Sequence, residues 1–204
     1  AKYHSGGRVV GIVGRQYKIY GKGENGAQSP AMAFSVDSDY PLADARFEQI
    51  GGVDQSYNNG TDLLRLTCTV TAIAETMRNH DGQSPYIAVG VKHGNACGAG
   101  FSYNSPADAV RMMVTGDPLA MFGGSVMLTF DLDQELAEIL ATAGMTGNAR
   151  QKFDCVIAAS VEGEAYEAMR REGDKCRFLQ NSALSGEICM SREPMIRQIY
   201  GGFQ

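Results

Sequence analysis

The sequence is poor in the patterns that mark disulfide-rich and metal-binding proteins. It holds only three histidines among 204 residues, and its five cysteines lie far apart without a CxxC pair. An odd, scattered set of cysteines argues against a disulfide framework and against a zinc site. Three histidines are too few for a metal cage built from protein side chains. We therefore expect reduced cysteines that act mainly as small apolar residues, and no bound metal.

The sequence also lacks an excess of positive charge and any long apolar run. A net charge of −5 argues against a nucleic-acid partner. An anionic small molecule is compatible with it, because such a site needs only a few local cations or backbone N–H groups. No apolar run approaches the roughly 20 residues that span a bilayer, and residues 1–7 lack the apolar stretch of a signal peptide. We expect no nucleic acid, no membrane association and a cytoplasmic location.

The hydrophobic pattern alternates between segments typical of strands and of helices. Strands are predicted at residues 8–13, 16–20, 86–91, 125–130, 154–159, 177–180 and 196–200. Helices are predicted from about 61 to 77, from 105 to 114, from 133 to 143 and from 162 to 171. This alternation predicts an α/β fold whose helices cover a mixed or mostly parallel sheet. Without a Pro/Ser-rich linker or an internal repeat, residues 1–204 are interpreted as one domain.

Two polar segments beside these elements are candidate ligand sites. Residues 23–28 (GENGAQ) follow a strand, and such a glycine-rich turn can present N–H groups to a phosphate, with Lys22 adding a positive charge. The alternative is a plain connecting loop. Residues 56–59 (SYNN) precede the long helix, where the asparagines either bind polar ligand groups or cap the helix.

Two further segments combine reactive side chains with glycine. Residues 91–98 (VKHGNACG) end an expected buried strand and place a cation beside a group that titrates near neutrality. Lys92 and His93 can serve one site only if the chain turns there, since neighbours in a regular strand point to opposite faces. The alternative is a solvated lysine beside a hydrogen-bonded histidine. Residues 117–124 (DPLAMFGG) form either an ordinary loop or one whose glycines allow close approach to a ligand.

Together these segments resemble the transformylase region of the bifunctional purine biosynthesis enzymes. The family pattern RYGENPHQ corresponds to residues 21–28, and FEQLxGKxxSYNN resembles residues 47–59. KHxNPCG matches residues 92–98, DPxSAFGG matches 117–124, and RxVxGGLLVQ is similar to 196–204. The resemblance covers the first half of the transformylase region; it includes neither the cyclohydrolase domain that precedes that region nor its second half.

The resemblance implies a three-layer, cytidine-deaminase-like α/β fold without the zinc that deaminases bind. It implies formyl transfer from 10-formyltetrahydrofolate, as co-substrate, to the 5-amino group of 5-aminoimidazole-4-carboxamide ribonucleotide. In that reaction His93 would act as base, and Lys92 would stabilise the oxyanion or protonate the departing nitrogen. The substrate-binding residues implied by the motif matches, with Lys22 added by position, are Lys22, Asn58, Phe122, Gly123 and Asp154.

The departures from the family pattern leave alternatives open. The family's Arg-Tyr, which helps hold the substrate phosphate, is Gly21-Lys22 here, so the phosphate must be held differently, for example by Lys22 and backbone amides. The family site lies between subunits and draws on the second half, which implies a homodimer or a partner chain. Asp154 could equally be an ordinary residue before a strand. A stand-alone IMP cyclohydrolase and a non-catalytic purine-nucleotide-binding subunit are the competing functions.

Overall fold

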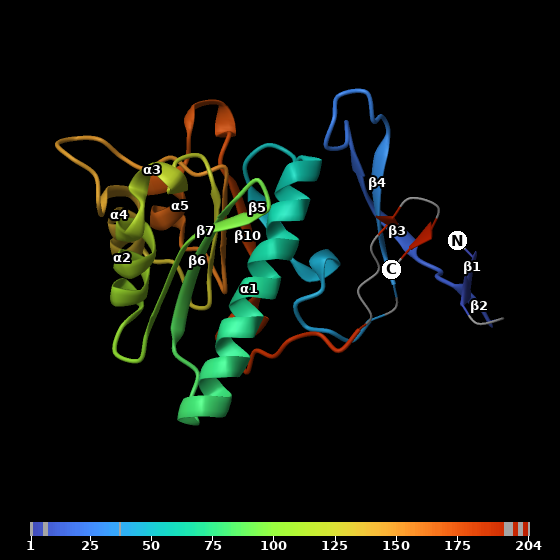
Figure 1. The fold of residues 1–204 in the computed structure, drawn as a ribbon. Helices are drawn as coiled ribbons and strands as arrows, with labels where there is room; N and C mark the ends of the chain where they lie inside the picture. The colour runs from blue at the N-terminus through green and yellow to red at the C-terminus, as the bar shows by residue number, and fades with distance from the viewer. Residues whose placement is uncertain (1, 6–7, 37, 194–197, 200–201, 204) are drawn as a thin grey trace.

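A six-stranded mixed sheet forms the centre of the molecule (Figure 1). The computed structural model describes residues 2–5, 8–36, 38–193, 198–199 and 202–203. The strand order is β5-β10-β9-β8-β6-β7, with β8, β9 and β10 parallel and the other pairs antiparallel. The strands are β5 (Glu48–Gly51), β6 (Tyr86–Lys92), β7 (Asn95–Ser102), β8 (Ser125–Leu128), β9 (Cys155–Ala158) and β10 (Arg177–Gln180).

Helices cover both faces of this sheet. The long helix α1 (Tyr57–Asp81) lies on one face, and α2 (Pro106–Gly116), α4 (Gln134–Thr142) and α5 (Gly163–Met169) lie on the other. Side chains of β6 alternate between the two layers: Ile87 and Val89 pack in the core under α1, whereas Ala88 packs in the core under α2 and α4. The predicted three-layer α/β architecture is confirmed.

The ends of α1 follow from local capping. The Ser56 side chain accepts a hydrogen bond from the Asn59 backbone N–H, and the Asn59 side-chain oxygen accepts one from the Ser56 backbone N–H. Gly82 ends the helix with φ 73°, a left-handed conformation that glycine adopts without a steric penalty. The helix therefore begins four residues before the expected start at Thr61, and the capping role considered for the asparagine pair belongs to Asn59.

The edge strand β7 was not among the strands predicted from the sequence. Its glycines lie against α2: a Cβ on Gly100 would come within 2.2 Å of the Ala109 carbonyl oxygen, and one on Gly98 within 2.7 Å of the Met113 carbonyl oxygen. The helix therefore approaches this strand more closely than any side chain would allow. The strand was missed because it consists largely of small residues, whereas β-branched residues are the usual signal of a strand.

A separate hairpin pairs β3 (Arg15–Tyr20) with β4 (Ala31–Ser35), and α1 stands between it and the central sheet (Figure 1). The buried Tyr20 ring meets the Tyr57 ring edge-on, with 5.8 Å between centroids, and so joins the hairpin to the start of α1. The remaining elements are β1 (Lys2–Ser5), β2 (Arg8–Gly11), α3 (Pro118–Met121), β11 (Gln198–Ile199), β12 (Gly202–Phe203) and the short 3-10 turns η1 (Asp44–Arg46), η2 (Glu172–Asp174) and η3 (Ser182–Ser185). The motif at 196–204 lies largely outside the described residues.

Within the described ranges, none of the helices combines the length and the apolar character that crossing a bilayer requires.

Candidate functional site

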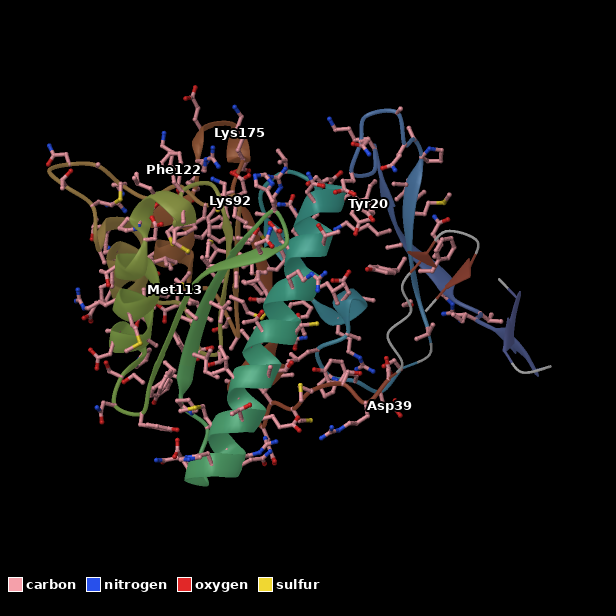
Figure 2. The ribbon with its side chains drawn as sticks, viewed as in Figure 1. Tyr20, Asp39, Lys92, Met113, Phe122 and Lys175 are labelled. Atoms are coloured by element: carbon pink, nitrogen blue, oxygen red, sulfur yellow. The ribbon has the colours of Figure 1, made fainter. Side chains whose placement is uncertain are left out.

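Several of the polar segments singled out in the sequence meet at one edge of the central sheet. Strand β6 runs against β8, so its C-terminal end lies beside the N-terminal ends of β8, β9 and β10. Val91, Ser125, Cys155 and Arg177 are neighbours across these four strands. In Figure 2, Lys92, Phe122 and Lys175 appear at the upper end of the molecule, whereas Asp39 lies toward the lower end. The sheet edge thus gathers the 91–98 and 117–124 segments and the residues around Asp154.

The chain turns directly after Lys92. His93 and Gly94 form the two-residue connection between β6 and β7, in which Lys92 pairs with Asn95. Both turn residues have positive φ, 52° for His93 and 74° for Gly94, which is the requirement of a type I′ hairpin turn. Histidine tolerates this left-handed region better than most residues. The turn on which a shared site for Lys92 and His93 depends is therefore present, and His93 is exposed at its tip.

A buried carboxylate fixes this turn. Asp62, in the second turn of α1, accepts a hydrogen bond from the Gly94 N–H at 2.8 Å and another from the Ser125 hydroxyl at 3.0 Å. Asp62 is only 7% exposed. It therefore joins α1, the β6–β7 turn and the start of β8. Sequence reasoning placed Asp62 only at a helix start; the one available signal was an acidic residue on the apolar face of that helix.

The Lys92 ammonium is held over the loop that precedes β8. Its Nζ donates to the Phe122 carbonyl at 2.8 Å, while Phe122 itself stays 44% exposed. Gly123 has φ 74°, and its N–H donates to the Lys152 carbonyl at 2.6 Å. The Asp154 N–H donates to the Gly124 carbonyl at 2.9 Å. Main-chain hydrogen bonds thus connect the Phe122–Gly124 loop to the Lys152–Asp154 segment, and we call these two segments the loop pair. It holds three of the predicted site residues, Phe122, Gly123 and Asp154.

The Cys97 thiol has no feature of a nucleophile. Burial raises the pKa of Cys97, and the nearby Lys92 charge only partly opposes this effect. Its sulfur contacts the Met121 sulfur at 3.4 Å. A thiol that stays protonated near neutral pH is a poor nucleophile.

The other predicted binding residues differ in their surroundings. The Asp154 carboxylate already pairs with the Arg171 guanidinium, which also donates to the Phe153 carbonyl at 3.1 Å. Asn58 is exposed in the first turn of α1, and Lys22 is exposed just after β3. In the glycine-rich turn, the Gly23 N–H donates to the Gln28 carbonyl at 2.7 Å. The Asn25 N–H donates to the Gln28 side chain at 3.0 Å. Both N–H groups are therefore occupied and cannot cradle a phosphate without a rearrangement.

An apolar hollow of about 450 Å³ lies between the hairpin and the outer face of α1. Its walls include Tyr17, Phe34, Asp44 and Leu64, and neither Lys92 nor His93 lines it. Tyr17 donates to Asp44, whose carboxyl pKa is raised by burial. Across the part of the chain that the structure describes, no group of three or more His, Cys, Asp or Glu side chains is placed to hold a metal ion.

Comparisons with known proteins agree with the motifs at this edge. Residues 12–203 match the family described as AICARFT/IMPCHase bienzyme. The bifunctional purine biosynthesis protein PurH of Prochlorococcus marinus strain MIT 9312 is 32% identical over 156 residues, which are 76% of this chain and 28% of that protein. PurH of Rippkaea orientalis is 29% identical over 158 residues, 78% of this chain and 27% of that protein.

The chain therefore spans less than a third of the length of these relatives. Among solved structures, the apo form of dCMP deaminase from the cyanophage S-TIM5 aligns with 12% identity and a TM-score of 0.35, over 54% of this chain and 94% of that one. The family match extends over nearly the whole sequence and includes the hairpin, α1 and the complete sheet edge. The chain belongs to the AICARFT/IMPCHase bienzyme family.

Proposed function

We propose that the chain acts in purine ribonucleotide biosynthesis as a formyltransferase, as a lone half or as one subunit. The formyl group passes from 10-formyltetrahydrofolate to the 5-amino group of 5-aminoimidazole-4-carboxamide ribonucleotide. The observation that carries the proposal is the tight turn after β6, which holds His93 exposed next to Lys92, whose ammonium binds the Phe122 carbonyl. The family match and the PurH relatives support a role in the same pathway.

The proposed chemistry needs a base and a cation at one place. The attacking amine is weakly nucleophilic, because its lone pair is conjugated with the imidazole ring and the carboxamide. His93 takes its proton as the nitrogen bonds to the formyl carbon. The bond from that carbon to the folate nitrogen then breaks, and the nitrogen receives a proton. Lys92 has one N–H committed to the Phe122 carbonyl and two left to stabilise the oxyanion or to supply that proton.

The substrate would lie along the sheet edge. In this proposal Phe122 and Gly123 contact its base and ribose, with Asn58 and Asp154 as further polar contacts and Lys22 near the phosphate. Asp154 can meet the substrate only if it shares its carboxylate with Arg171, since the two are already paired. About half of the Asp154 side chain remains accessible for a second partner.

A partner chain completes this proposal. The hairpin exposes apolar side chains, with Ile19 64%, Met32 44% and Phe34 57% accessible. Contiguous apolar surface of this kind is unusual on a monomer. We therefore include a homodimer, or a second polypeptide that supplies the other half of the site, in the proposed function.

The catalytic pair is tested by substitution. Lys92→Ala and His93→Ala should each lower formyl transfer by on the order of 100-fold or more, because each removes a group that acts in the transition state. His93→Asn removes the base but keeps a residue suited to positive φ, so it separates chemistry from turn geometry. Cys97→Ala is the control that should keep most activity.

The assay pairs formyl transfer, followed by release of tetrahydrofolate, with IMP ring closure on the same preparations. Full formyl transfer by folded His93→Asn protein would refute the assignment of the base. Ring closure without formyl transfer would favour a cyclohydrolase. Nucleotide binding without either activity would favour a non-catalytic subunit.

A further inference from the structure

Two cations beside the Asp54-Gln55 segment have neutral partners. The Lys18 ammonium, on β3, donates to the amide oxygen of Gln55. The Arg177 guanidinium, at the start of β10, donates to the Lys175 carbonyl at 2.9 Å and to the Asp54 carbonyl at 3.4 Å. Among the described residues, neither has a carboxylate within ion-pair distance. Both cations therefore bind the Asp54-Gln55 segment, which leads into α1.

The backbone of β3 aims Lys18 at this segment. The register between β3 and β4 shifts between Gln16 and Lys18, and a bulge of this kind re-aims the side chains beside it. As a result the Tyr17 hydroxyl reaches Asp44. The Lys18 Nζ lies 5.7 Å from the centroid of the Tyr20 ring, on the face of the hairpin that is turned toward the central sheet. Burial lowers the pKa of Lys18, and the charges of Asp44 and Asp54 oppose that effect.

Arg177 reaches the same place from the sheet. It pairs laterally with Cys155, whose side chain belongs to the core under α1, so Arg177 also points to the α1 face. Burial raises the pKa of the Cys155 thiol, and the charges of Arg177 and Lys18 both act against that rise. Two cations from distant parts of the chain thus act on one buried group.

The spacing along the edge suits an elongated ligand with one anionic end. From the end of β6 to the start of β10 is three steps between neighbouring strands, about 14 Å at roughly 4.8 Å a step. A ribonucleotide carries its phosphate and its aromatic amine at opposite ends, with the ribose between them.

We infer that Lys18 and Arg177 together bind the phosphate of the ribonucleotide, at the β10 end of the edge, and leave its amine at Lys92 and His93. This inference rests on the proposed formyl transfer. Two partly buried cations match the double charge of a phosphate monoester, and the guanidinium can donate two parallel hydrogen bonds to it. Lys22 lies exposed beyond the end of β3. The carboxylates of Asp44 and Asp54, which both act on Lys18, are anionic groups that the phosphate has to tolerate.

The test compares ligands that differ only in the phosphate. Calorimetry on the full chain would use 5-aminoimidazole-4-carboxamide ribonucleotide, its riboside and ribose 5-phosphate. Lys18→Met and Arg177→Gln should each weaken ribonucleotide binding by about tenfold or more, the effect of losing a hydrogen bond between charged groups. Riboside binding should change less than about twofold. Arg15→Met removes an exposed cation from the same strand and is the matched control. Arg177→Lys, which keeps the charge, should recover part of the loss if the fold is intact.

Equal losses for ribonucleotide and riboside would overturn the inference, and so would a phosphate-specific loss in Lys22→Ala with none in Lys18→Met. Ribose 5-phosphate binding that depends on Lys18 and Arg177, with no preference for the imidazole ribonucleotide, would support the anion site and contradict the proposed function. A parent chain that binds none of the three ligands would overturn both.

Discussion

Asp62 joins α1 to the turn that carries His93, so removal of its carboxylate should lower both the stability of the fold and the activity of the site. The carboxylate accepts hydrogen bonds from Gly94 and Ser125, and each bond to an ionised group contributes about 1.5–3 kcal/mol. Asp62→Ala should therefore cost about 3 kcal/mol or more, since it also leaves the Ser125 hydroxyl, 1% exposed, without a partner. For a chain of this length that predicts a fall in Tm of roughly 6–12 °C.

Two milder variants divide that effect. Asp62→Asn keeps an oxygen for the Gly94 N–H and offers its NH₂ group to the Ser125 hydroxyl, so it should cost about 1 kcal/mol. Ser125→Ala removes one hydrogen bond, so its loss of stability should also be smaller than that of Asp62→Ala. Urea unfolding followed by circular dichroism gives the free energies, and formyl transfer at a temperature where all variants are folded gives the effect on the turn. Equal stability of Asp62→Ala and the parent would refute the role assigned to this carboxylate, as would equal losses in the alanine and asparagine variants.

Two more predictions concern the periphery of the molecule. Glu75 accepts hydrogen bonds from the Met190 N–H and from Arg192, and these partners lower its pKa. These bonds should contribute fully to stability when the pH is above the ordinary pKa of a glutamate. Their contribution should disappear as the pH falls through the lowered pKa of Glu75. Glu75→Gln should accordingly speed hydrogen exchange at residues 189–193 at neutral pH, and unchanged exchange would contradict this. In sedimentation velocity the pure chain should run as a dimer that Phe34→Ser weakens; a monomeric parent would count against self-association.

Elements with a strong local signal were predictable from the sequence. The apolar run of β6 and the Ser105-Pro106 start of α2 both lie where they were expected. A strand buried on both faces has a continuous apolar sequence, and a helix cap depends only on neighbouring residues. The turn after Lys92 was likewise expected from the glycine that follows His93, and it is present.

Features that depend on tertiary packing were not predictable. Strand β7 consists largely of small residues, and only the approach of α2 shows why. Asp62 reads as an ordinary helix residue until Gly94 and Ser125 are brought to it from 32 and 63 positions away. Lys18 and Arg177 lie at opposite ends of the sequence, and no local pattern joins them. Side chains whose role lies in a distant partner carry no periodic or spacing signal.

The loop pair beside Lys92 has a consequence for how this family can diversify. Its shape depends on main-chain bonds, from the Gly123 N–H to the Lys152 carbonyl and from the Asp154 N–H to the Gly124 carbonyl. Such bonds do not depend on the identity of the side chains at 152 and 154, so those positions can change with little cost to the scaffold. The side chains at this rim can therefore change under selection while the His93-Gly94 turn stays fixed.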